Sequence, residues 1–239
     1  MSYWRRSEVR KPCDVVFQLT NHGAFVGGVD EAGRGCLLGP LVVAGVSVNS
    51  EGARALKKLG VKDSKKLSSA RRERLYPQIM EVSERVHWTM ITPDEIDFVV
   101  TTGKKLRKLN YLEAIHFARV IDKLGASRVT VDASDVIPER FRDDIIGNLG
   151  SKCSVVAVHK ADRDYPVVSA ASIIAKVNRD REVDLLREVH GEFGSGYPSD
   201  PATRAFFKDR MLRGESLPAY VRKSWKTWLN LRQSLITSF

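Results

Sequence analysis

Three short runs of β-branched and small apolar residues are each followed by an acidic residue. The run "AFVGGV" leads into Asp30, "SRVTV" leads into Asp132, and "SKCSVVAV" is followed shortly afterwards by Asp162. Runs of this composition bounded by turn-forming residues predict β-strands, and the segments between them carry apolar residues at helical spacing. The chain is therefore expected to form a mixed α/β layer fold, with carboxylates at or just after the strand ends.

Further elements are predicted between these strands. "LVVAGVSV" and "RVHWTMI" have the composition of strands. Capping residues or apolar spacing predict helices that begin near residues 69, 93, 106, 167, 201 and 220. The first of these helices is expected to kink or split at Pro77. The basic segment 57–67 before it is expected to be a loop.

Four acids occupy the predicted strand ends or follow them: Asp30, Glu31, Asp132 and Asp162. Functional side chains in open α/β sheets gather at such ends. If the ends share one edge, the acids converge, and their repulsion calls for divalent cations, of which Mg²⁺ or Mn²⁺ suit oxygen ligands. Two such ions about 3.5–4 Å apart support phosphodiester hydrolysis in many nucleases. Each acid taken singly is more often an exposed carboxylate or a helix cap.

The chain is basic, with 39 Lys and Arg against 29 Asp and Glu and a net charge of +10. This balance favours a polyanionic partner such as nucleic acid, with a merely solubilising surface as the alternative. Gly33 and Gly35 on either side of Arg34 allow the backbone to approach a substrate closely, and a backbone contact to a 2′-hydroxyl separates RNA from DNA. The alternative for this segment is a tight turn between strands.

Two other segments are candidates for substrate contacts. Lys65 in "KDSKKLS" is suited to a phosphate, although a lysine-rich surface loop explains the segment equally well. Tyr197 in "SGYPSD" is placed to stack on a sugar or base, or else to close a turn against the core. His116 and His159 lack a second histidine at metal-ligand spacing, so buried or capping roles are expected for both.

The three cysteines are an odd number and widely spaced, which argues against a disulfide framework or a structural zinc site. An intracellular, cytoplasmic location is therefore expected. The N-terminal residues include no long apolar run of the kind found in signal peptides or membrane spans.

Five segments resemble, in order and spacing, the signature segments of type 2 ribonuclease H (ribonuclease HII): "GVDEAGRGCLLGPLVVAGV", "KDSKKLS", "VTVDASD", "HKADRDYPVVSAASIIAKVNRD" and "GSGYPSDPATRAF". The last of these is closer to the archaeal branch. The resemblance implies a ribonuclease H-like fold, with a central mixed five-stranded sheet flanked by helices and a C-terminal helical segment. It also implies hydrolysis of the RNA strand of RNA–DNA hybrids and cutting 5′ of single ribonucleotides in duplex DNA, leaving 5′-phosphate and 3′-hydroxyl ends.

The resemblance assigns roles residue by residue. Asp30, Glu31, Asp132 and Asp162 match the family's four catalytic, metal-binding acids. Gly33, Arg34 and Gly35 match the segment whose backbone recognises the 2′-hydroxyl. Tyr197 matches the tyrosine that stacks on the deoxyribose beyond the cut. Arg163 beside the fourth acid, where a smaller residue is expected, is a departure from the family pattern.

The resemblance also divides the chain into a catalytic domain over residues 1–195 and a substrate-gripping helical segment over 196–239. Residues before Ala24 form an N-terminal extension that is longer than usual. A monomer is expected, with no membrane partner, and the tail "LRQSLITSF" resembles the short peptides by which some family members bind a sliding clamp. Two alternatives stay open: a related two-metal nuclease acting on DNA, and a non-catalytic protein that binds RNA or hybrids.

Overall fold

The structure is a computed structural model that describes residues 25–61, 67–103 and 107–225. Its strands are β1 (Val26–Ala32), β2 (Leu41–Val48), β3 (Arg85–Ile91), β4 (Arg128–Asp132) and β5 (Ser154–Val158). They form one sheet in the order β3-β2-β1-β4-β5. β1 pairs antiparallel with β2, and β2 antiparallel with β3, whereas β1, β4 and β5 run parallel. The expected mixed five-stranded sheet is confirmed.

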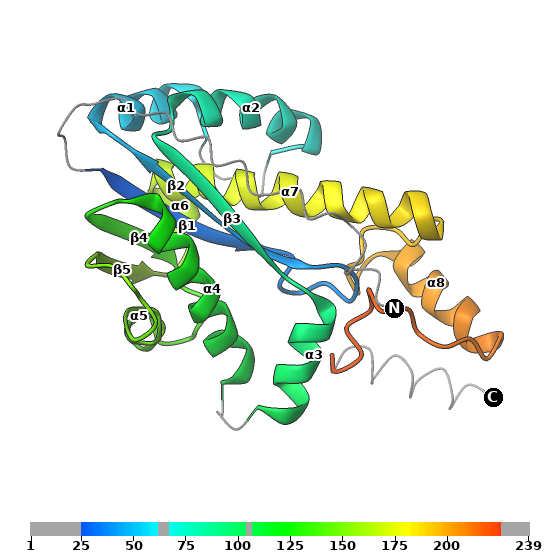
Figure 1. The fold of residues 1–239 in the computed structure, drawn as a ribbon. Helices are drawn as coiled ribbons and strands as arrows, with labels where there is room; N and C mark the ends of the chain where they lie inside the picture. Colours follow the sequence, from blue (N-terminus) through cyan, green and yellow to red (C-terminus); the bar gives the residue numbers. More distant parts are fainter. Residues whose placement is uncertain (1–24, 62–66, 104–106, 226–239) are drawn as a thin grey trace.

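Helices cover both faces of this sheet (Figure 1). One face carries α1 (Ser50–Leu59), α2 (Ser69–Val82) and α7 (Pro166–His190), and the other carries α3 (Pro93–Thr102), α4 (Lys108–Leu124) and α5 (Pro138–Ile146). The short α6 (Ala161–Asp164) lies directly before α7, and α8 (Pro201–Leu212) lies at the far end of α7. Each face has its own apolar core, and a third core joins the end of α7 to α8 and to residues 220–221.

Several predicted helix ends are confirmed by their caps. The Thr92 hydroxyl accepts a hydrogen bond from the Glu95 backbone N–H at 3.2 Å, as a capping box requires. Gly125 ends α4 in the left-handed conformation, which glycine adopts without steric cost. The Asp200 carboxylate accepts from the Ala202 N–H at 2.9 Å at the start of α8. Local capping chemistry therefore determined these boundaries.

Four other predictions of secondary structure were wrong or incomplete. Lys57 and Lys58, in a segment expected to be loop, lie in α1, which is capped by Asn49 and whose residues 50–56 were not predicted. Pro77 lies inside α2 without splitting it, because neighbouring apolar residues of α2 are buried in the core shared with α7. The helices α5 and α6 were not predicted at all. Residues 220–225 are not helical, because Val221 forms a β-bridge with Leu38; residues 226–239 lie outside the described part.

The backbones of β1 and α7 approach each other closely at Gly28. A Cβ atom on Gly28 would lie 2.5 Å from the carbonyl carbon of Val167 and from the nitrogen of Val168. The first turns of α7 continue with the buried small residues Ser169 and Ala170. Only glycine fits at this contact, so the sequence "VGGVD" allows α7 to lie directly on the strand that carries Asp30.

Among the described helices, none is both long enough and apolar enough to cross a lipid bilayer.

The substitution Gly28→Ala is expected to lower the free energy of unfolding by about 1–3 kcal/mol or more, because the clashing atoms belong to the backbone and cannot rotate away. Thermal or denaturant unfolding measures this change. Gly147→Ala is the matched control. Gly147 has a right-handed helical conformation, and its nearest neighbour would be 3.4 Å from the new Cβ. The control should stay within about 0.5 kcal/mol of the parent protein, and an equal loss in both variants would contradict the close-packing argument.

Candidate active site

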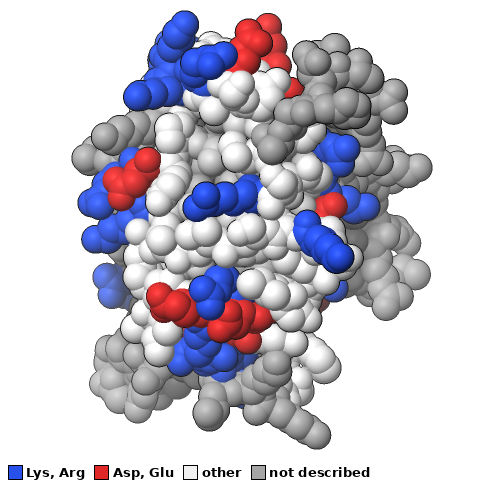
Figure 2. All heavy atoms as spheres, turned by 90° about the vertical axis from the view of Figure 1, so that its left-hand side faces the viewer, with Lys and Arg blue, Asp and Glu red and all other residues white. Residues whose placement is uncertain are grey.

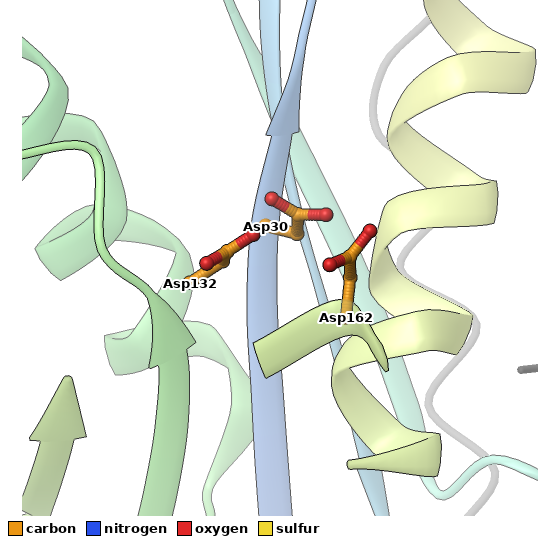
Figure 3. A group of neighbouring side chains, drawn as sticks. All are labelled: Asp30, Asp132 and Asp162. Atoms are coloured by element: carbon orange, nitrogen blue, oxygen red, sulfur yellow. The ribbon is translucent and has the colours of Figure 1, made fainter. Parts of the chain in front are cut away.

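Three carboxylates converge at one edge of the sheet (Figure 3). Asp30 comes from β1, Asp132 from the last position of β4, and Asp162 from α6. Each offers one oxygen atom, and these oxygens all lie within 4.8 Å of one another. Asp30 and Asp162 are each only 3% exposed, whereas Asp132 is partly exposed, so the three acids form a compact group with two buried members.

The fold explains this convergence. β1 and β4 are parallel neighbours with Val29 opposite Val131, which places the next residues, Asp30 and Asp132, side by side. The chain returns to them after β5 through Lys160, whose backbone has a positive φ of 58°. The Ala161 N–H then donates to an Asp132 carboxylate oxygen at 3.2 Å. This turn places α6, and with it Asp162, against the strand ends.

Burial makes the ionised form of Asp30 costly and raises its pKa. The Lys176 charge and a hydrogen bond from Ser172, both on α7, partly oppose this shift, and the negative charge of Asp162 adds to it. The Lys176 ammonium also donates to the Ser172 hydroxyl. α7 therefore supplies the positive charge and the donor that hold Asp30 in place.

Glu31 is not part of the group of three. Adjacent residues of a strand point to opposite faces of the sheet, and Glu31 faces the side of α4. Burial raises its pKa well above the usual value, and the nearby charges of Asp30, Glu113 and Asp132 raise it further. One of its buried carboxylate oxygens, Oε2, has no hydrogen-bond partner within the described part of the chain. Such an oxygen is costly unless a proton or a cation satisfies it.

The turn that follows β1 spans Gly33–Cys36 and is called here the glycine turn. It closes with a hydrogen bond from the Cys36 N–H to the Gly33 carbonyl at 3.2 Å, and Gly33 has a φ of +88°. The Arg34 side chain points to α4, where its Nε donates to both oxygens of the fully buried Glu113 at 2.9 and 3.1 Å. Its Nη2 donates to Asn110 at 2.6 Å.

This contact continues into a network of charges on α4 and α5. The Asn110 amide donates to Asp135 at 2.9 Å, and Asp135 also accepts from Arg107 and Arg140. Burial raises the pKa of Glu113 to about 7, although Arg34 opposes the shift. Burial alone would raise the pKa of Asp135, but its hydrogen bonds lower it, and the bond from Arg140 has the largest lowering effect. The network anchors the Arg34 side chain to the body of the protein.

The C-terminal segment braces the same turn from the other side. Arg222 is fully buried, and its guanidinium donates to the carbonyl of Arg34 at 3.0 Å and twice to that of Gly39 at 3.1 and 3.2 Å. Burial lowers the pKa of Arg222 to about 10. The bridge between Leu38 and Val221 completes the contact. Residues almost two hundred positions apart in the chain thus hold one turn.

Tyr197 lies in a second turn, Gly194–Tyr197, called here the tyrosine turn. Its side chain is 40% exposed, and burial of its hydroxyl end beside Cys36 raises the pKa of Tyr197 to about 12. The Leu37 N–H donates to the Gly196 carbonyl at 2.7 Å and so joins the tyrosine turn to the segment that follows the glycine turn. The structure therefore places Tyr197 next to the glycine turn, although the two are far apart in sequence.

The other residues singled out in the sequence are two histidines, Arg163, Lys65 and the cysteines. His116 is buried and contacts Thr89 and Glu95, as expected. His159, for which a buried or capping role was expected, is exposed, so the buried role is wrong there; one of its ring nitrogens lies 3.2 Å from the Val136 carbonyl. Arg163 is exposed beside Asp164. Lys65 lies outside the described residues. Cys36 and Cys153 are free thiols, and Cys13 lies outside the described part.

Five polar residues around the site were missed from the sequence: Glu113, Ser172, Lys176, Arg179 and Arg222. Each interrupts or adjoins an apolar stretch, which is a usable signal because a charged side chain at a core position is rarely left without a partner. The signal does not name the partner, which in each case lies on a distant element.

Positive charge is unevenly distributed on the face shown in Figure 2. Several lysine and arginine side chains gather near the top and along the left side of the view, others lie singly among uncharged residues, and the lower part mixes acidic with basic groups.

The donor set suits a divalent cation such as Mg²⁺ or Mn²⁺, since the group of three offers only carboxylate oxygens. Glu31, outside that group, has a buried oxygen without a hydrogen-bond partner among the described residues. A mixed five-stranded sheet with helices on both faces, and acids converging from β1, β4 and α6, defines a metal-dependent nuclease of the ribonuclease H-like class.

Comparison with known proteins identifies the family within this class. The family model described as Ribonuclease HII matches residues 27–228. Ribonuclease HII of Archaeoglobus fulgidus is 45% identical over 212 residues, which cover 89% of this chain and 98% of that protein. The chain belongs to the ribonuclease HII family, and it is a type 2 ribonuclease H with endoribonuclease activity.

Solved structures agree with this assignment. Ribonuclease H2 from Pyrococcus horikoshii superposes with a TM-score of 0.79 at 38% identity, covering 89% of this chain and 99% of that one. The ribonuclease HII of Archaeoglobus fulgidus, solved as a complex with PCNA, also has a TM-score of 0.79, at 45% identity and with coverage of 90% and 100%. The ribonuclease H-like fold is therefore established for the chain.

Without divalent cations, the free energy of unfolding is expected to fall as pH rises above 3.8 to 4.5, the ordinary pKa values of Asp30 and Glu31. Both pKa values are raised in the folded protein, so the folded state binds more protons than the unfolded chain in this range. Saturating Mg²⁺, at about 100 times its dissociation constant, should restore about 2.7 kcal/mol. Unfolding curves across pH, with and without Mg²⁺, measure both effects.

Asp30→Asn should flatten the pH dependence and reduce the stabilisation by Mg²⁺. The matched control is Asp164→Asn, which removes an exposed acid from the same short helix as Asp162. This control should behave like the parent protein. Identical curves for Asp30→Asn and the parent would contradict the placement of Asp30 in the cation site.

Proposed function

We propose that this enzyme cuts the RNA strand of RNA–DNA hybrids and cuts 5′ of single ribonucleotides in duplex DNA, leaving 5′-phosphate and 3′-hydroxyl ends. The observation that carries the proposal is the glycine turn, which directly follows the strand bearing Asp30 and Glu31. A backbone able to approach a ribose closely thus lies next to acids able to hold cations. A general DNA nuclease would need the acids but not the turn.

The roles of the residues follow from their surroundings. Asp30, Asp132 and Asp162 would hold two Mg²⁺ or Mn²⁺ ions, with Glu31 as a fourth ligand from outside the group of three. When bound, such ions activate water and stabilise the leaving oxygen in phosphodiester hydrolysis. Lys176 and Ser172 hold Asp30 in its orientation. Burial of the acids excludes bulk water and strengthens their hold on the cations.

Substrate recognition is divided between the two turns. The backbone of Gly33, Arg34 and Gly35 contacts the ribose 2′-hydroxyl, and the partly exposed ring of Tyr197 stacks on the deoxyribose beyond the cut. The anchoring of the Arg34 side chain on Glu113 supports a backbone role for this segment, because it ties up much of the guanidinium. Lys65 is proposed to contact a phosphate.

In this proposal residues 1–195 form the catalytic domain, with an extension before Ala24, and residues 196–239 grip the substrate. The protein acts as a monomer. Its cytoplasmic location stays a prediction from the cysteine pattern.

Asp30→Asn is expected to abolish cleavage while duplex binding persists, because the ion-holding oxygen is lost but the recognition turns remain. The assay uses labelled DNA duplexes with one ribonucleotide, an RNA–DNA hybrid and an all-DNA control, each with Mg²⁺ or with EDTA. Cutting at the ribonucleotide should require the metal and spare the control. Asp164→Asn should keep full activity. Equal cutting of all-DNA duplex would favour the general nuclease, and metal-independent binding without cleavage would favour the binding protein.

A sliding clamp is the proposed protein partner, since the related archaeal enzyme was solved in complex with PCNA. The expected contact is the tail "LRQSLITSF", which lies outside the described residues. Deleting these residues should abolish binding to the clamp in a pull-down or calorimetric titration and leave cleavage of a short duplex unchanged. Clamp binding that survives the deletion would place the contact elsewhere.

A further inference from the structure

The long helix α7 carries a buried cation, Arg179, that takes no part in the group of carboxylates. Arg179 is only 4% exposed, whereas its neighbour Arg181 is exposed and pairs with Glu73 at the surface. Burying a guanidinium is costly unless its donors are satisfied, and Nε of Arg179 has no hydrogen-bond partner among the described residues, so its other nitrogens must offset the cost. The contacts of Arg179 therefore indicate what the side chain does.

One set of contacts is with the glycine turn. The Nη2 atom of Arg179 donates to the Cys36 sulfur at 3.0 Å. A Cβ atom on Gly33 would lie 3.3 Å from Cγ of Arg179 and 3.5 Å from its Nε. The stem and the head of this arginine thus lie against both ends of the turn.

A second set of contacts is with the tyrosine turn, and Nη1 of Arg179 also donates to the carboxylate of Asp180 at 3.3 Å. The same Nη2 atom donates to the Ser195 carbonyl at 2.8 Å, and the guanidinium carbon lies 5.3 Å from the centroid of the Tyr197 ring. This distance is within the range of a cation–π contact. A Cβ atom on Gly196 would lie 3.2 Å from Nη2. One side chain therefore touches both recognition turns.

Arg179 also connects the two turns to the catalytic acids. It lies three residues after Lys176, which acts on Asp30, and residues three apart share one face of a helix. α7 is a single continuous helix of 25 residues packed on β1. One rigid helix, α7, thus sets the positions of the acids and of both turns.

We infer that Arg179 is a positioning residue that fixes the glycine turn relative to the Tyr197 ring, so that a ribose and the deoxyribose after it are recognised together as one junction. This inference rests on the proposed function of the two turns. A lysine cannot replace the arginine, because the planar guanidinium reaches two acceptors and an aromatic ring at once whereas an ammonium is a single compact charge.

The test compares kcat/KM for a duplex with one ribonucleotide and for an RNA–DNA hybrid. In the hybrid the cut does not depend on a ribose–deoxyribose junction. Arg179→Lys should therefore lower kcat/KM about ten- to a hundredfold on the single-ribonucleotide duplex, as expected for small errors of alignment, and change it little on the hybrid. The matched control Arg181→Lys, on the exposed side of α7, should leave both values unchanged. Equal losses on the two substrates would overturn the inference.

A double-mutant cycle separates positioning from a general structural role. The junction preference is the ratio of kcat/KM for the single-ribonucleotide duplex to kcat/KM for the hybrid. If Arg179 acts through Tyr197, adding Arg179→Lys to Tyr197→Ala should lower this ratio little further, because the effects of coupled residues are not additive. Fully additive losses would overturn the inference. Should Arg179→Lys fail to fold in thermal unfolding, Cys36→Ala enters the cycle instead. It removes the sulfur acceptor but keeps the buried charge, and the same loss of junction preference, smaller in size, is expected.

The parent protein distinguishes this inference from the proposed function. Cutting at the single ribonucleotide by the parent, together with an unchanged substrate preference in Arg179→Lys and Cys36→Ala, would overturn the inference alone. Absence of cutting at the ribonucleotide by the parent would overturn the proposed function, and the inference with it.

Discussion

The close contact between α7 and β1 is the constraint on which the rest of the site depends. Gly28 lets the helix backbone lie directly on the strand, and this brings Ser172 and Lys176 to Asp30. It also places α6, and with it Asp162, beside the strand ends. A side chain at position 28 would lift the start of α7, and the carboxylates would then lose both their geometry and their compensating charge.

That geometry concentrates negative charge where water is largely excluded. Burial makes ionisation of Asp30 and Glu31 costly and raises the pKa of both. Binding of cations must offset this cost of ionisation. The same part of the fold buries Glu113, which Arg34 neutralises in part. The site is thus a balance of buried acids against a few basic groups, and divalent cations complete it.

In the proposed function, recognition depends on side chains that brace the two turns rather than on the turns alone. Arg222 holds the carbonyl groups of Arg34 and Gly39, and Arg179 lies between the glycine turn and Tyr197. Both guanidiniums are almost fully buried. Loops that are braced in this way keep their backbone groups in place before the substrate binds, which reduces the entropic cost of recognition.

The sequence by itself determined the strands, most helix caps and the candidate acids, because caps, turns and alternating patterns are interactions between near neighbours. It also indicated that Asp30 and Asp132 belong to comparable strands, although β1 continues past Asp30 to Ala32. It did not reveal most of α1, nor α5 or α6, nor that Glu31 lies outside the group of three. Only the tertiary structure decided which distant residues, such as Lys176 and Arg222, meet the site. Their partners come from the packing of whole elements, and no local pattern in the chain encodes that packing.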